Sequence, residues 1–283
     1  MRFFTTKMRK RIANNIKKEV TFMTNNKYPD IQLANFRDLG GYRNTDGYTV
    51  KDNKIFRSPC LADLSEQTKQ ALDGLGIEYV LDFRSKAEAD GAPDYVPKGA
   101  TYLHLPAART RGKMVVNPKD VARMIPRWAG PKLSIGVFRL RFRHLYRKFP
   151  FRNSAYRKMF EIMNGGSTFL VHCSAGKDRT GVACMLILLA FGVPYDVIER
   201  DYLLSNELRK DVNAEYEKQF VVYPHYETMK QIFEVALNVS PDLLRTAYDK
   251  ILRKYGSVEE YFLQEYGADK ARLELWRSQY MSK

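Results

Sequence analysis

The sequence is poor in cysteine and tryptophan, and it contains no apolar run long enough to cross a membrane. Its 283 residues include three cysteines, Cys60, Cys173 and Cys184, which are too few and too widely spaced for a disulfide framework or a zinc site. The longest apolar stretch, residues 182–193, falls short of the about 20 residues that a transmembrane helix needs. Residues 1–27 lack the continuous apolar core of a secretory signal. We therefore expect a cytoplasmic protein without a metal or cofactor, with non-classical export left open.

Acidic residues are nearly absent from two segments. The chain has 47 Lys and Arg against 32 Asp and Glu, a formal net charge of +15. Residues 1–27 and 107–158 are rich in Lys and Arg, and each contains a single acid. We predict a basic, disordered tail at 1–27 and a single domain at 28–283, in which 107–158 is a basic insertion. A membrane-touching helix in the tail, and a true start at Met23 rather than Met1, are alternatives.

Residues 172–181 read His-Cys-Ser-Ala-Gly-Lys-Asp-Arg-Thr-Gly and are the most informative segment of the chain. An apolar stretch precedes them and a longer one follows, which predicts a strand, a short loop and a buried helix. The N–H groups of such a loop and the dipole of the helix surround an anion with positive potential. The same field is expected to lower the pKa of the Cys173 thiol, and Arg179 can bind two phosphoryl oxygens at once. This signature loop can therefore supply a nucleophile, an anion cradle and a cationic clamp.

The spacing Cys-x5-Arg-Thr resembles the signature loop of the cysteine-based protein tyrosine phosphatases. The fuller motif is similar to that of the atypical bacterial branch, which acts on phosphotyrosine and often on phosphoinositides. Further matches extend the resemblance over about residues 30–281, and they lie at 35–41, 56–58, 81–85, 201–206 and 255–257. The resemblance implies a phosphatase fold, a phosphocysteine intermediate and no cofactor.

The resemblance assigns roles to the loop residues. Cys173 attacks phosphorus, Arg179 stabilises the transferred group, and the hydroxyl of Thr180 is expected to hydrogen-bond the Cys173 sulfur. Lys177 is expected to point outward as a second cation, which suits substrates with more than one phosphate. The residues expected to bind or orient the phosphoryl group are His172, Ser174, Ala175, Gly176, Lys177 and Gly181.

The leaving oxygen needs a proton, and two aspartates are candidates for the general acid. Asp178 lies inside the loop next to Arg179, and in the family it is implicated in acid–base chemistry. Asp82 ends the predicted strand 78–82, where it is expected to face the same crevice or to pair structurally. Tyrosine phosphatases usually carry this acid on a Trp-Pro-Asp loop, but residues 128–131 read Trp-Ala-Gly-Pro. We favour Asp178.

The basic insertion contains an amphipathic stretch. Apolar residues within 137–149 recur at helical spacing, although 138–143 alone alternate like a strand. We predict a helix with Arg139, Arg143 and Arg147 along one flank, placed as a lid over the signature loop. Such a helix can lie on an anionic membrane surface, or it can pack on its own domain with a solvated basic edge. We do not expect nucleic-acid binding, because no recognised module accompanies the charge.

Alternating strands and helices, followed by helices alone, predict an α/β fold with a parallel-rich central sheet flanked by helices. It is expected to be protein tyrosine phosphatase-like, with a basic helical lid insertion and a helical C-terminal part. A hairpin is predicted from residues 49–50 and 54–57 after a turn. Further strands are predicted at 78–82, 101–105 and 169–172. Ligands then belong at the carboxyl ends of the strands, where Cys173 lies.

These features predict a cysteine-dependent phosphomonoester hydrolase that acts on phosphotyrosine proteins and phosphoinositides. One alternative is an inositol phosphate phosphatase of the phytase-like type. Another is a non-catalytic module that uses the basic loop to bind phosphorylated partners.

Overall fold

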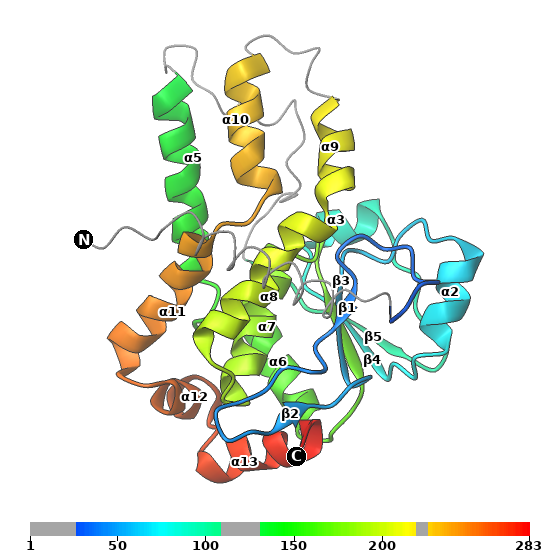
Figure 1. The fold of residues 1–283 in the computed structure, drawn as a ribbon, viewed down its shortest axis with the longest axis vertical. Coiled ribbons are helices and arrows are strands. Elements are labelled where there is room, and N and C mark those ends of the chain that lie inside the picture. Colours follow the sequence, from blue (N-terminus) through cyan, green and yellow to red (C-terminus); the bar gives the residue numbers. More distant parts are fainter. Residues whose placement is uncertain (1–26, 109–130, 219–225) are drawn as a thin grey trace, which may run out of the picture.

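The computed structural model describes residues 27–108, 131–218 and 226–283. Its main sheet has the strand order β1 (Arg37–Asp38), β3 (Ile55–Ser58), β6 (Phe169–His172), β4 (Tyr79–Asp82) and β5 (Thr101–His104). Strands β3, β6, β4 and β5 are parallel, and β1 runs antiparallel to β3. The predicted parallel-rich sheet is confirmed. Because β6 is the middle strand, its carboxyl end brings the signature loop to the centre of the sheet edge (Figure 1).

Helices cover both faces of this sheet, as predicted. Val171 on β6 faces a large core that contains α7 (Asp178–Ala190), and its neighbour Leu170 faces a smaller core next to α2 (Glu66–Asp73). Every residue of β6 is buried, so the strand is a continuous apolar run until His172. Helix α7 is almost wholly apolar because it lies inside the large core.

The C-terminal part is helical, as predicted, except for a short final strand. The other helices are α3 (Lys86–Gly91), α5 (Pro131–Tyr146), α6 (Ser154–Met163), α8 (Tyr195–Leu208), α9 (Lys210–Lys218), α10 (Tyr226–Leu237), α11 (Pro241–Tyr255), α12 (Val258–Tyr266) and α13 (Lys270–Tyr280). Among the described residues, no helix has both the length and the apolar character needed to span a bilayer.

The predicted hairpin is wrong. Strand β2 (Thr49–Val50) pairs with β7 (Met281–Ser282), which comes from the other end of the chain. Strand β3 has β1 on one side and β6 on the other, so neither of its edges is free for β2. The backbone of β2 forms its strand hydrogen bonds with β7 instead.

The predicted helix of the basic insertion is present as α5, while residues 109–130 of that insertion lie outside the described part. Helix α5 packs on α10 through an apolar cluster that includes Phe138 (Figure 1). Its opposite side exposes Leu133, Val137 and Leu140, which are 50%, 51% and 65% exposed. The helix therefore has apolar residues on two faces, one packed and one turned outward.

The predicted tail at 1–27 lies outside the described residues except for Lys27. The Lys27 ammonium pairs with Asp52 at 2.8 Å and with Asp38 at 3.3 Å, so the end of the segment assigned to the tail contacts the folded body.

A buried ion-pair network joins α8 to the sheet. Asp201 is 1% exposed and accepts hydrogen bonds from Arg37 Nε at 2.8 Å, Arg57 at 2.5 Å and the Tyr42 hydroxyl at 2.8 Å. Burial alone would raise the pKa of Asp201, but Arg37 and Arg57 lower it to about 2. The carboxylate is therefore charged at neutral pH and forms ion pairs with two buried arginines.

We predict that Asp201→Ala lowers the free energy of unfolding by about 3–5 kcal/mol, because it leaves two buried guanidinium groups without their carboxylate. Denaturant unfolding at pH 7 measures this. Among the described residues, the exposed Asp196 on the same helix pairs only with Arg200, so Asp196→Ala is the control and should cost at most about 1 kcal/mol. Because the folded pKa of Asp201 is depressed, the difference from wild type should shrink as the pH falls from about 4 toward 2. Equal effects of the two variants would contradict the prediction.

Candidate active site

The signature loop folds sharply between β6 and α7. Gly176 has φ +64°, and a Cβ atom there would lie 2.3 Å from the Ser58 carbonyl oxygen. Only glycine fits this close approach of two backbones. Cys173 is 2% exposed at the base of the loop, and Ser174 and Ala175 are half-buried at its rim.

Three consecutive carbonyl groups of the loop accept hydrogen bonds from donors in other segments of the chain. The acceptors are Ser174, Ala175 and Gly176, and the donors, at 2.8–3.3 Å, are the Cys60 amide, the Asn35 side-chain amide and the Arg57 guanidinium. Within the described part of the chain, the amides of residues 174–177 have no protein acceptor. The peptide groups thus keep their N–H donors free at the N-terminus of α7, which is the geometry of an anion cradle.

Arg179 reaches back along the loop and is held by a carboxylate. Its two terminal nitrogens donate to Glu88 at 2.8 and 3.0 Å, and Nε has no hydrogen-bond partner. Burial lowers the pKa of Arg179, but Cys173 and Glu88 raise it more, so the net shift is upward. The two-nitrogen edge expected to clamp phosphate is therefore occupied by Glu88, and the free donor is Nε–H.

Glu88 has no role among the residues predicted from the sequence. It is 4% exposed, caps the start of α3 together with Ser85, and accepts a hydrogen bond from the Ser174 hydroxyl at 2.7 Å. Burial raises the pKa of Glu88, but Arg179 lowers it to about 2. The Ser-x-x-Glu capping pattern was a visible signal for the helix start. Nothing local indicated that the same carboxylate also orients Arg179.

Asp178 is the more accessible of the two candidate acids, with its side chain 16% exposed. One oxygen accepts a hydrogen bond from the Tyr146 hydroxyl at 2.6 Å, and the other lies 3.1 Å from Lys177 Nζ. Lys177 itself is only 5% exposed and donates to the Ala236 carbonyl of α10. The expectation that Lys177 points outward is therefore wrong, because two acceptors hold its ammonium inside.

Thr180 and Gly181 lie in the first turn of α7. The Thr180 hydroxyl is buried and has no hydrogen-bond partner among the described residues, so the expected bond to the Cys173 sulfur is not formed. A Cβ atom at Gly181 would lie 2.9 Å from the Tyr202 ring, so this glycine allows α8 to pack closely on α7.

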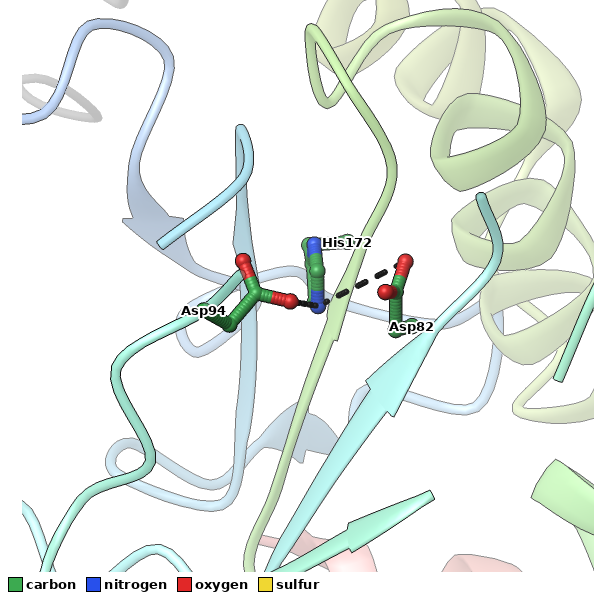
Figure 2. Close-up of side chains that lie close together, drawn as sticks. All are labelled: Asp82, Asp94 and His172. Atoms are coloured by element: carbon green, nitrogen blue, oxygen red, sulfur yellow. Dashed lines mark ion pairs between the residues drawn. The ribbon is translucent and has the colours of Figure 1, made fainter. Parts of the chain in front are cut away.

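His172 and Asp82 belong to a buried cluster beneath the loop. The His172 ring lies between Asp82 and Asp94, with its Nε2 atom 3.8 and 3.4 Å from their carboxylates (Figure 2). Arg84 donates to both carboxylates, and Tyr102 also donates to Asp82. Asp82 is fully buried, so the expectation that it faces the crevice is not met.

Arg84 is the permanent cation of this cluster and pairs with both carboxylates. Burial raises the pKa of Asp82, but His172 and Arg84 lower it well below its usual range. Burial lowers the pKa of His172 despite its two carboxylate neighbours, so the imidazole is neutral near pH 7. The donor types Asp82, Asp94 and His172 would suit a metal ion, but the Arg84 guanidinium already binds both carboxylates.

We predict that Glu88→Gln lowers kcat/KM for phosphate-ester hydrolysis by about 10–100-fold, because Arg179 loses the partner that fixes its position. Steady-state kinetics at pH 6–8 measure this, and Glu88 is charged throughout that range. The control is Asp90→Asn on the same helix, since Asp90 is exposed and, in the part of the chain that the structure describes, pairs only with Lys86. If Glu88→Gln changed only thermal stability and left kcat/KM as in wild type, Glu88 would be no more than a helix cap.

Comparisons with known proteins agree with this geometry. Residues 31–282 match the tyrosine phosphatase family. The chain is 31% identical over 244 residues to a Cupriavidus necator protein named as a tyrosine-protein phosphatase, across 85% of this chain and 84% of that protein. It is 29% identical over 266 residues to the triple specificity protein phosphatase PtpB of Mycobacterium tuberculosis, across 86% and 95% of the two chains. With a Cys-x5-Arg loop at the end of its central strand and these bacterial relatives, the chain belongs to the tyrosine phosphatase family.

Proposed function

We propose that this tyrosine phosphatase hydrolyses phosphomonoesters through a phosphocysteine intermediate, on phosphotyrosine proteins and on phosphoinositides. The observation that carries the proposal is Cys173 at the base of a loop whose amides at 174–177 have no acceptor among the described residues. A dianionic phosphoryl group supplies the acceptors that those amides lack. The thiolate then lies beneath phosphorus, opposite the leaving oxygen.

In the first step, the Cys173 sulfur forms a bond to phosphorus as the bond to the leaving oxygen breaks. Loop amides and Arg179 stabilise the charge on the equatorial oxygens. Arg179 would use Nε–H and one N–H of the terminal nitrogen that now donates to the Ser174 hydroxyl at 3.2 Å, while both terminal nitrogens keep their bonds to Glu88. Water then attacks phosphorus, which releases phosphate and restores the thiolate.

Asp178 is our proposed proton donor to the leaving oxygen. Its side chain is partly exposed at the rim of the loop, whereas Asp82 is fully buried and bonded to Arg84 and Tyr102. A group that gives a proton to substrate and recovers it from water needs access to both. After the first step, the Asp178 carboxylate would accept a proton from the attacking water.

Helix α5 supports the phosphoinositide part of the proposal. The outward Leu133, Val137 and Leu140 would insert into the headgroup region, and the exposed Arg147 and Lys148 near the end of the helix would face anionic lipid. The inner side of the same helix reaches the signature loop through Tyr146. A membrane-bound α5 would thus place the loop near lipid headgroups, in the manner expected of the predicted lid.

The two alternatives differ from this proposal in what they require of the loop. An inositol phosphate phosphatase would use the same chemistry on a soluble ring and would gain nothing from the outward apolar face of α5. A non-catalytic module would need neither the nucleophile nor the proton donor, yet the chain retains Cys173, Asp178 and Arg179 together.

We predict that the protein releases phosphate from a phosphotyrosine peptide and from phosphoinositides in anionic vesicles, and that Cys173→Ser lowers both rates by at least about 100-fold. Serine stays protonated at neutral pH and is a poor nucleophile here. A chelator should have no effect, and turnover on vesicles should fall with added salt, since exposed charges are screened beyond about 8–10 Å at 0.1–0.15 M. The buried Cys184 gives the control, Cys184→Ser, which keeps the nucleophile. Full activity of Cys173→Ser would reject the mechanism.

We predict that Asp178→Asn slows hydrolysis of phenyl phosphate by about 10²–10⁴-fold, because the phenolate needs a proton to leave. Nitrophenyl phosphate, whose leaving group barely needs that proton, should lose far less. Rates of both esters with Asp178→Asn and Asp82→Asn measure the difference. Leaving-group dependence in the Asp82 variant alone would reassign the acid, and equal losses for both esters in the Asp178 variant would limit Asp178 to shaping the loop.

A further inference from the structure

Arg209 is a buried cation beside the signature loop that lacks an acidic partner. It follows α8 directly, is 7% exposed, and pairs with no carboxylate among the described residues. Among the described residues, its Nε atom has no hydrogen-bond partner, and its side chain makes a single hydrogen bond, a long one of 3.4 Å from a terminal nitrogen to the Ala175 carbonyl. Arginines are rarely buried without a partner, because removing the charge from water is costly.

The other buried cations around the loop each have a carboxylate partner. Arg179 pairs with Glu88, Arg57 pairs with Asp201, and Lys177 pairs with Asp178. Burial lowers the pKa of Arg209, while Tyr216, Cys173 and Asp178 oppose the shift. Two of these three groups belong to the active site, so the uncompensated charge of Arg209 lies within electrostatic reach of the nucleophile and the proposed acid.

Its contact with Ala175 fixes where this charge lies. Ala175 is half-buried at the loop rim, and its carbonyl accepts from the Asn35 side chain and from Arg209, on the side of the loop away from the amides that would hold the scissile phosphate. A guanidinium at this carbonyl is therefore next to the phosphate cradle and separated from it by one peptide group. An anion there would supply the acceptors that Arg209 lacks, and a planar guanidinium binds phosphate oxygens in pairs.

We propose that Arg209 binds a second phosphate of the substrate, carried on the ring position adjacent to the scissile phosphate. This inference rests on the proposed function and assigns to Arg209 the part that the sequence suggested for Lys177. Vicinal phosphate esters on an inositol ring have this chemistry, both as free inositol phosphates and as lipid headgroups. Phosphotyrosine lacks the second phosphate and is bound by the loop alone.

The test compares inorganic phosphate with pyrophosphate, which adds a second phosphate beside the first. Calorimetry on the Cys173→Ser background gives both dissociation constants without turnover. We expect Arg209→Gln to weaken pyrophosphate binding by about 10–100-fold, the range for hydrogen bonds to charged groups, and to weaken phosphate binding much less. The measured quantity is the ratio of the dissociation constants for phosphate and pyrophosphate. A general disturbance of the loop would change both constants alike and would leave this ratio unchanged.

Lys210→Gln is the matched control, since it removes the same charge from the next, exposed residue and should leave the ratio unchanged. Arg209→Lys keeps the charge but not the planar fork and should restore the ratio only in part. If Arg209→Gln weakened phosphate and pyrophosphate binding equally or not at all, the ratio would stay unchanged and the proposal would be wrong. Arg209 would then only support the Ala175 carbonyl.

Turnover separates the two sources of the second phosphate. In the active enzyme, Arg209→Gln should lower kcat/KM equally for a soluble inositol phosphate with vicinal phosphates and for the corresponding lipid in vesicles. If kcat/KM fell only for the lipid in vesicles, Arg209 would act at the lipid surface, and the proposal of a second phosphate subsite would be wrong. If the wild-type enzyme hydrolysed neither ester, the proposed function would fail, while the pyrophosphate binding ratio would still decide the role of Arg209.

Discussion

One buried carboxylate holds the signature loop in its working shape. Asp201 binds Arg37 and Arg57 from two neighbouring strands, and Arg57 also donates to the Gly176 carbonyl. Arg37 in turn donates to the Asn35 side-chain oxygen, which directs the Asn35 amide toward the loop carbonyls. The carbonyls turn outward because these donors are fixed, and the loop amides are left without protein acceptors. The anion cradle is thus a consequence of an ion pair that no substrate touches.

Around this cradle, buried guanidinium groups are bound by carboxylates. Arg179 is held by Glu88, and Arg84 is held by Asp82 and Asp94, so these buried guanidinium groups are fixed and partly neutralised. The attraction that remains for an anion comes from backbone amides, from one edge of Arg179 and from the unpaired Arg209. In a water-excluded site such fixed donors act more strongly than they do in water, and they need no rearrangement during reaction.

Helix α5 is joined to the proposed acid by a hydroxyl group. Tyr146, at the end of α5, donates to Asp178 and lies 2.6 Å from the Tyr202 hydroxyl of α8. A shift of α5 would therefore alter the surroundings of the proposed acid. Since the other side of α5 carries exposed apolar residues, contact of that side with a surface would be transmitted to the active site through a short path.

The sequence by itself determined the central strand, the signature loop and helix α7, because contiguous residues encode them through an apolar run, glycines and a helix N-terminus. It could not identify the partner of Arg179, since Glu88 lies about ninety positions away and meets it only when α3 packs against the loop. Lys177 was misjudged because its long side chain takes whichever acceptors the fold provides. The pairing of β2 with the final strand, the burial of Asp82 and the unpaired state of Arg209 were likewise decided by tertiary packing, which alone determines which charges share a low-dielectric interior.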